Sequence, residues 1–156
     1  MTIKQGDLSL LKHPVAEALL ASNVPARLAY NWKDGTPRVV PIWFHWDGTE
    51  LVFASPQKAP KLKALKSGAK VAVTIDENAF PYRVLMIRGT ANVAMTDEAV
   101  TPEYESCARR YFGDEQGAAW VGQVAQMGQK MARIRVKPEW VGVLDFETRF
   151  PSAISG

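Results

Sequence analysis

Short apolar segments separated by turn residues dominate the hydrophobic pattern of this chain. Three of them, residues 26–32, 38–46 and 50–55, are rich in β-branched and aromatic side chains, and connections containing Asp34-Gly35 and Asp47-Gly48 separate them. Asp-Gly pairs favour the positive φ angles of tight hairpin turns. The pattern therefore predicts an antiparallel three-stranded meander with residues 38–46 as its central strand.

The predicted central strand has an unusual composition. Its sequence is RVVPIWFHW, so the strict alternation of a strand leaves apolar side chains on both faces. Pro41 lies at its middle, where a strand paired on both sides would lose a ladder hydrogen bond. Proline is normally confined to edge strands and bulges, so its place in a central strand needs a specific explanation.

The rest of the pattern adds further strands and a few helices. We expect strands at 70–76, 82–95, 130–136 and 139–146, with a bulge or bend at Gly89, and helices at 14–20, 56–68, 101–111 and 114–127. About seven short strands joined mainly by hairpins predict a mainly β protein, a closed or partly open antiparallel barrel with flanking helices. Residues 1–156 are long enough for one such domain, with a frayed end at 151–156.

Composition narrows the classes of function. The net charge is +3, and the lysines and arginines are dispersed, so the charge does not indicate a nucleic-acid partner. One cysteine and two histidines provide neither an internal disulfide nor a metal-ligand cluster. The N-terminal residues lack the apolar region of a secretion signal, and no stretch is long enough to span a bilayer, so we expect a cytoplasmic protein without a membrane partner.

The side chains themselves offer little reaction chemistry. No nucleophile motif, carboxylate pair or Gly-rich phosphate loop is present, so any catalysis is expected to belong to a cofactor, and no catalytic residue is identified. Ser55 ends one predicted strand, and Lys58 and Lys61 begin the helix that follows, where a hydroxyl and two cations could hold a phosphate group. The alternative interpretation is a solvated lysine face beside an ordinary turn serine.

The ordered pattern of residues 35–73 resembles that of the pyridoxamine 5′-phosphate oxidase-like split-barrel flavoproteins. The run DGTPRVVPIWFHWDGTELVFASPQKAPKLKALKSGAKVAVTID carries most of the resemblance, and MARIRVKPEWVGVLDF is similar to the closing strands of the family. The matching positions are Gly35, Arg38, Pro41, Trp43, Ser55, Lys61, Leu62, Leu65, Val71 and Val73.

The resemblance implies a split barrel that binds FMN at a homodimer interface. The strand equivalent to RVVPIW would lie along the isoalloxazine ring, and Pro41 would help to keep its main-chain groups available to the ring. The surplus of aromatic residues, five Trp, four Tyr and six Phe, independently favours a homodimer. The implied cofactor-binding residues are Arg38, Val39, Val40, Pro41, Ile42, Ser55, Lys58 and Lys61, with Trp120 contributed by the second chain.

The implied function is an FMN-dependent oxidoreductase acting on a small molecule, with a nicotinamide donor as a candidate second substrate. The chain end GVLDFETRFPSAISG lacks the Arg-Leu-His-x-Arg-like substrate motif of the true oxidases, which argues against pyridoxamine phosphate oxidation. Deazaflavin is the alternative cofactor, although Ala64 stands where many deazaflavin-using relatives have Asn. A second alternative is a non-catalytic flavin- or haem-binding protein on the same fold, with His13 or His45 as candidate iron ligands.

Overall fold

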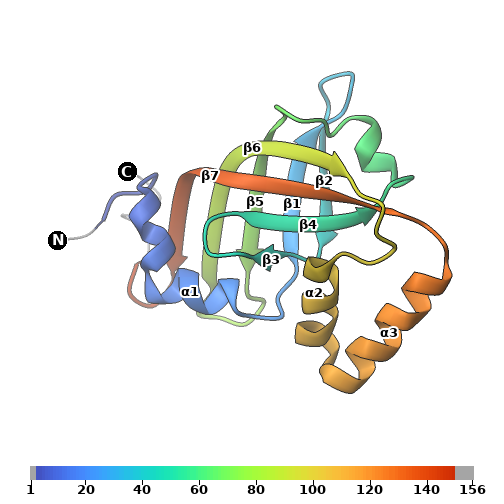
Figure 1. Ribbon diagram of the computed structural model, residues 1–156. Helices are drawn as coiled ribbons and strands as arrows, with labels where there is room; N and C mark the ends of the chain where they lie inside the picture. The colour runs from blue at the N-terminus through green and yellow to red at the C-terminus, as the bar shows by residue number, and fades with distance from the viewer. Residues whose placement is uncertain (1–2, 150–156) are drawn as a thin grey trace.

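The computed structural model describes residues 3–149, within which seven strands form a single antiparallel sheet accompanied by three α-helices (Figure 1). The strands are β1 (Ala26–Asn31), β2 (Pro37–Ile42), β3 (His45–Trp46), β4 (Leu51–Pro56), β5 (Lys70–Asp76), β6 (Arg83–Met95) and β7 (Met131–Asp145). The helices are α1 (Pro14–Leu20), α2 (Pro102–Phe112) and α3 (Asp114–Gln126), with 3-10 turns η1 (Leu8–Lys12) and η2 (Pro60–Lys63). The mainly β, split-barrel prediction is confirmed, whereas the predicted frayed end at 151–156 lies outside the described residues.

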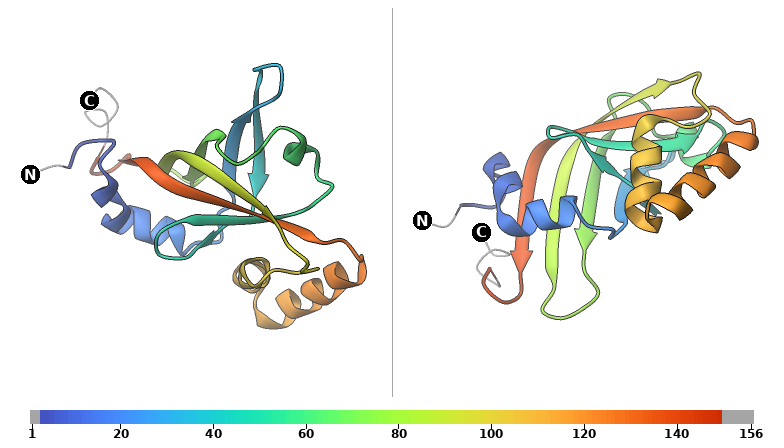
Figure 2. Two further views of the ribbon diagram at one scale, coloured as in Figure 1. Left: turned by 45° about the horizontal axis from the view of Figure 1, so that its top comes forward. Right: turned by 60° about the horizontal axis from the view of Figure 1, so that its bottom comes forward.

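The order of strands across the sheet is β2-β1-β5-β6-β7-β4-β3, so β2 and β3 form its two edges. The chain nevertheless passes from β2 to β3 through only two residues, Trp43 and Phe44. Three Cα–Cα steps span at most about 11 Å, so the two edges must approach each other at this corner. The sheet therefore curls into a half-barrel, which the two views of Figure 2 show from different sides.

The prediction that residues 38–46 form one strand at the centre of a meander was wrong. The β1–β2 hairpin has the expected pairing, and the pairing expected across Asp47-Gly48 is present only for the two residues of β3 against β4. Strand β2 itself has no neighbour on its other side. The sequence alternation continues through Trp43 and Phe44 because both are apolar, yet Phe44 is fully buried in the core while Trp43 packs against α2. Pro41 consequently lies on an edge strand. Because β2 is paired on one side only, the missing N–H of proline removes no hydrogen bond to a second neighbouring strand.

The two strands predicted at 130–136 and 139–146 are one continuous strand, β7. Pro138 does not interrupt it because it lies opposite Gly89, at a register shift between Arg88 and Gly89. The bulge predicted at Gly89 is therefore confirmed. A Cβ atom there would lie 2.2 Å from the carbonyl oxygen of Lys137, so the close approach of the two backbones requires glycine.

The helix predicted at 56–68 is reduced to the single turn η2. Pro60 occupies its first position as expected, but the turn ends at Lys63 instead of continuing to Gly68. Leu62 and Leu65 are both buried and hold this segment against the core. A turn of this length has no macrodipole of consequence, so a helix dipole cannot contribute to the predicted phosphate site.

The helices lie outside the curled sheet. Helix α1 begins where predicted, with His13 as its N-cap, and packs on strands β5, β6 and β7. Helices α2 and α3 form a hairpin that projects from the sheet beside β3 and β4 (Figures 1 and 2). The predicted Thr101 cap is confirmed, because its side chain accepts a hydrogen bond from Tyr104 N. No helix among residues 3–149 is both long and apolar enough to cross a membrane.

Candidate cofactor site

The predicted cofactor strand is an apolar, solvent-exposed sheet edge. Val39 is 64% exposed, Arg38 and Pro41 are exposed, and Val40 and Ile42 are half-buried. The Arg38 guanidinium lies 5.2 Å from the centre of the Trp32 ring, on the neighbouring strand β1. An apolar edge strand with an unpaired outer side can bind a flat ring or another chain along its main-chain groups.

Ser55 has a buried hydroxyl without a hydrogen-bond partner. The residue lies near the end of β4 opposite Ala132 of β7 and is only 2% exposed. Its Oγ makes no hydrogen bond within the part of the chain that the structure describes. A buried hydroxyl left in this way costs free energy, and an incoming acceptor such as a phosphate oxygen would remove that cost.

Lys61 is the partly buried cation of the adjoining segment. It lies in η2, six residues after Ser55, and burial lowers the pKa of its ammonium group from the ordinary 10.5. Neither a hydrogen bond nor an ion pair engages its ammonium group within residues 3–149. Lys58 is exposed. Ser55 and Lys61 thus provide an uncompensated donor and an uncompensated charge, which fit an anionic group.

The fold brings the beginning of β2 and the η2–β5 connection to the same end of the sheet. Pro37 of β2 and Lys70 of β5 line one surface cavity together, although the sequence separates them widely. Figures 1 and 2 likewise show η2 near the β1–β2 hairpin. None of Ser55, Lys58 and Lys61 lines this cavity, and Arg38 lies beside Trp32.

Trp120 lies in an aromatic cluster of its own chain. Its Nε1 donates a hydrogen bond to Tyr104 Oη at 2.9 Å, and its ring lies edge-on to Phe112. Trp43 joins the same cluster and stacks on Tyr111 with ring centres 5.0 Å apart. The cluster fixes the α2–α3 hairpin against the corner between β2 and β3. Sequence patterns could not reveal it, because its members come from three separate elements.

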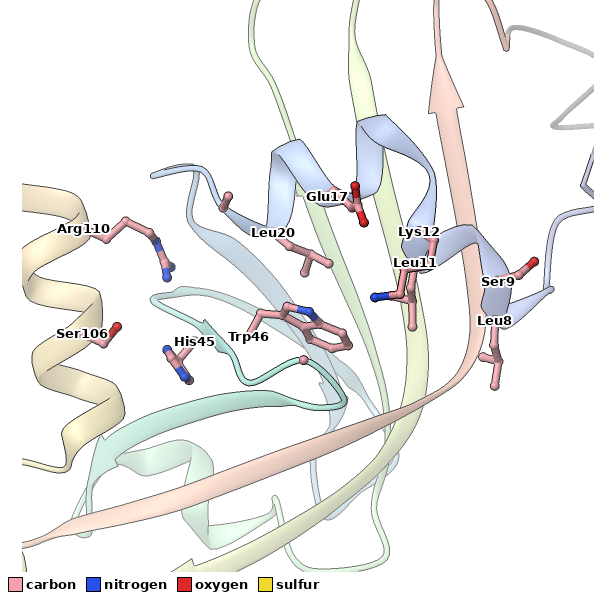
Figure 3. A pocket seen from close by; sticks show the side chains of 12 residues that line it. Leu8, Ser9, Leu11, Lys12, Glu17, Leu20, His45, Trp46, Ser106 and Arg110 are labelled. Carbon is pink, nitrogen blue, oxygen red and sulfur yellow. The ribbon is translucent and has the colours of Figure 1, made fainter.

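The two histidines occupy different environments. His13 Nδ1 accepts a hydrogen bond from Val15 N at 3.2 Å, which makes it the cap of α1. His45 lines a cavity of about 740 Å³ together with Trp46, Ser106 and Arg110 (Figure 3). Within the described residues, no group of three or more His, Cys, Asp or Glu side chains could hold a metal ion. Sequence reasoning missed this cavity because η1, α1, β3 and α2 all contribute to it.

Comparison with known proteins places these features in context. The model of the pyridoxamine 5′-phosphate oxidase family matches residues 13–145. A solved structure named F420 reductase is 27% identical, with a TM-score of 0.63 over 81% of this chain and 94% of that chain. No protein of curated function matches the sequence.

Two further solved structures share the fold. A conserved hypothetical protein from Mycobacterium tuberculosis is 21% identical over 93% of this chain and 91% of that chain, with a TM-score of 0.71. A heme storage protein from Vibrio cholerae is 16% identical over 85% of this chain and 93% of that chain, with a TM-score of 0.62. At these identities the likeness concerns the fold alone.

Proposed function

The chain belongs to the pyridoxamine 5′-phosphate oxidase family, and from that premise we propose that it is an oxidoreductase that holds a flavin-type cofactor against β2, with FMN as the first candidate. The observation that carries this proposal is the unpaired, buried Ser55 hydroxyl six residues before the half-buried Lys61 cation. Both groups are in an unfavourable state in the free protein and gain a partner when an anion binds.

The protein's own groups position the cofactor. Ser55 Oγ donates a hydrogen bond to a phosphate oxygen, and Lys61 neutralises the phosphate charge, with Lys58 contributing from the surface. The open edge of β2 presents main-chain groups to the ring edge, and Val39 and Pro41 supply apolar contact. The bound cofactor supplies hydride or electron transfer, which the side chains of this chain cannot perform.

Deazaflavin is a second candidate, favoured by the F420 reductase that is 27% identical over 81% of the chain. The difference at Ala64, which follows η2 and is half-buried, bears on this choice because an asparagine amide would be lost there. The same Ser55 and Lys61 arrangement would serve the phosphate of either cofactor. Equilibrium titration with FMN and with F420 under identical conditions distinguishes the two candidates, because only the true cofactor should bind at micromolar concentration or better.

The cofactor site is completed by a second copy of the chain. Edge strand β2 pairs only with β1 and exposes Val39, a surface that would remain open in a monomer. In the dimer, Trp120 of one chain approaches the cofactor bound by the other. Light scattering at micromolar concentration, with and without FMN, tests this arrangement. A monomer that still binds FMN tightly would overturn the dimeric site while leaving the roles of Ser55 and Lys61 intact.

The decisive experiment compares Lys61→Ala with Lys66→Ala. Lys66 lies beyond η2 and is exposed, so it has the same charge without the burial. Lys61→Ala should weaken cofactor binding by about 1.5–3 kcal/mol, the range for a charge-assisted hydrogen bond, and Lys66→Ala should change it little. Equal losses would mean that only diffuse positive charge attracts the cofactor. Anaerobic mixing of the loaded protein with NADH or NADPH then separates a reductase from a non-catalytic cofactor-binding protein.

A further inference from the structure

None of the proposed cofactor residues lines the cavity of about 740 Å³ shown in Figure 3. Its walls come from η1, α1, β3 with its following turn, and α2, and none of Arg38, Ser55 or Lys61 lines it. A cavity of this size is in the range that accommodates a small organic molecule.

The floor of the cavity is apolar and partly aromatic. Leu20 of α1 is 5% exposed, and Leu11 of η1 and Trp46 of β3 are half-buried. Figure 3 shows the Trp46 indole between the α2 side of the cavity and the η1 side. A half-buried indole at the centre of an apolar floor favours a ligand with a flat or aliphatic body.

Arg110 places a cation without a carboxylate partner among residues 3–149 at one end of the cavity. Its Nη2 donates a hydrogen bond to the Phe44 carbonyl, and the guanidinium lies 4.7 Å from the centre of the Phe44 ring. Its Nε is buried and has no hydrogen-bond partner. No carboxylate of residues 3–149 lies within ion-pair distance of it, whereas the adjacent Arg109 pairs with Glu105 at 2.9 Å.

Neighbouring polar groups complete this end of the cavity. Ser106 lies one helical turn before Arg110 on the same face of α2, and His45 lies across from both on β3 (Figure 3). At the opposite end, Lys12 extends toward Trp46. Glu17 is the only carboxylate among the lining residues, so two cations face one anion and the wall retains positive charge.

We infer that this cavity is a second ligand site, which binds a small carboxylic acid with an aromatic or aliphatic body. The body lies on Trp46 and Leu20, and the carboxylate reaches Arg110, whose planar guanidinium matches a carboxylate in geometry. Ser106 is within the same end of the cavity and supplies a hydroxyl donor. The site shares no lining residue with the proposed flavin site and does not depend on the proposed redox function.

The test uses 2-naphthoate as the probe and its neutral analogue 2-naphthalenemethanol as the comparison, both titrated into the full chain by calorimetry. We expect naphthoate to bind about tenfold or more tightly than the alcohol, because only the acid pairs with Arg110. Arg110→Gln should remove that preference, and Arg109→Gln, the matched control on the next helix position, should leave it unchanged. Amide and indole NMR shifts should locate the probe at Trp46.

Several outcomes would overturn the inference. Equal binding of the acid and the alcohol would reduce the cavity to an unselective apolar site, and tighter binding of naphthyl phosphate would give it a different ligand class. Displacement of naphthoate by FMN would mean that the two sites are one. Because Arg110→Gln also removes the bond to the Phe44 carbonyl, Lys12→Gln at the exposed end provides a second variant. Because the carboxylate is placed at Arg110, Lys12→Gln should keep most of the preference for the acid. A loss as large as that in Arg110→Gln would mean that only diffuse positive charge attracts the probe, and an unchanged preference in Arg110→Gln refutes the inference.

Discussion

Replacing Ser55 by alanine should stabilise the protein without cofactor, although serine to alanine changes in a core usually destabilise. The hydroxyl is buried, with the residue 2% exposed, and its Oγ has no hydrogen-bond partner among the described residues. Burying such a group lowers the free energy of unfolding by about 1–3 kcal/mol, because the lost hydration is not replaced by a hydrogen bond. Removing one oxygen leaves a void of roughly 10–15 Å³, which costs only about 0.3 kcal/mol at about 24 cal/mol per Å³.

The net expectation for Ser55→Ala is a gain of about 1–2 kcal/mol in the free energy of unfolding. For a chain of this size, that gain raises the melting temperature by roughly 2–8 °C. Urea unfolding of the cofactor-free protein measures it directly, because a shift in the midpoint at constant slope reports a change in stability. Binding should change in the opposite direction, with FMN affinity falling about tenfold or more as the phosphate loses its donor.

Ser67 provides the matched control for this measurement. Its Oγ accepts a hydrogen bond from Val93 N at 2.8 Å and donates one to Val93 O at 3.3 Å, so its hydroxyl is fully used. Ser67→Ala should therefore lose about 1 kcal/mol and leave FMN binding unchanged. If Ser55→Ala destabilises the protein as much as Ser67→Ala does, the Ser55 hydroxyl already has a partner in the free protein, and the argument for a waiting phosphate donor fails.

Three other perturbations test separate parts of the structure. Burial raises the pKa of the Cys107 thiol to about 11, so alkylation by iodoacetamide at pH 8 should be negligible until the protein is unfolded, and rapid labelling of the native protein would contradict this. Gly89→Ala should cost about 3 kcal/mol in urea unfolding because its Cβ would lie 2.2 Å from the carbonyl oxygen of Lys137, whereas Gly122→Ala, with no atom nearby, should gain about 0.5–1 kcal/mol. Because burial lowers the pKa of Lys61, the unfolded chain binds more protons than the folded chain just below pH 10.5. Wild-type stability should therefore rise with pH across this window relative to Lys61→Met, and Lys61→Met should be the more stable of the two at pH 7. Parallel pH profiles would refute the burial argument.

Local signals in the sequence were sufficient for the elements that local chemistry determines. The β1–β2 hairpin follows from the Asp34-Gly35 turn, where Gly35 has a φ of 83°. The start of α2 follows from the Thr101-Pro102 cap, and the bulge follows from Gly89 in an otherwise regular strand. Each of these features depends on the backbone preferences of one or two residues, and those preferences follow directly from the amino-acid types.

The errors arose where distant partners decide the outcome. Trp43 and Phe44 are as apolar as their neighbours, so the alternation could not show that one packs on α2 and the other enters the core. Pro138 normally suggests the end of a strand, but its partner at the register shift is Gly89 of β6, almost 50 residues earlier. For the site, Ser55 and Lys61 could be selected from their order in the chain, whereas the Arg110 cavity depends on four elements and had no sequence signature.

The position of β7 has a consequence for the order in which this protein can fold. β7 lies between β6 and β4, and its first residues, Met131–Val136, pair with β4 residues about 80 positions earlier. A chain emerging from the ribosome can form the β1–β2 and β5–β6 hairpins early, but β4 has only the two residues of β3 beside it until β7 is synthesised. The edges of β4 and β6 therefore stay open until β7 has been synthesised. Contacts this distant in sequence slow folding and prolong the aggregation-prone state, so chaperone demand should be greatest just before β7 emerges.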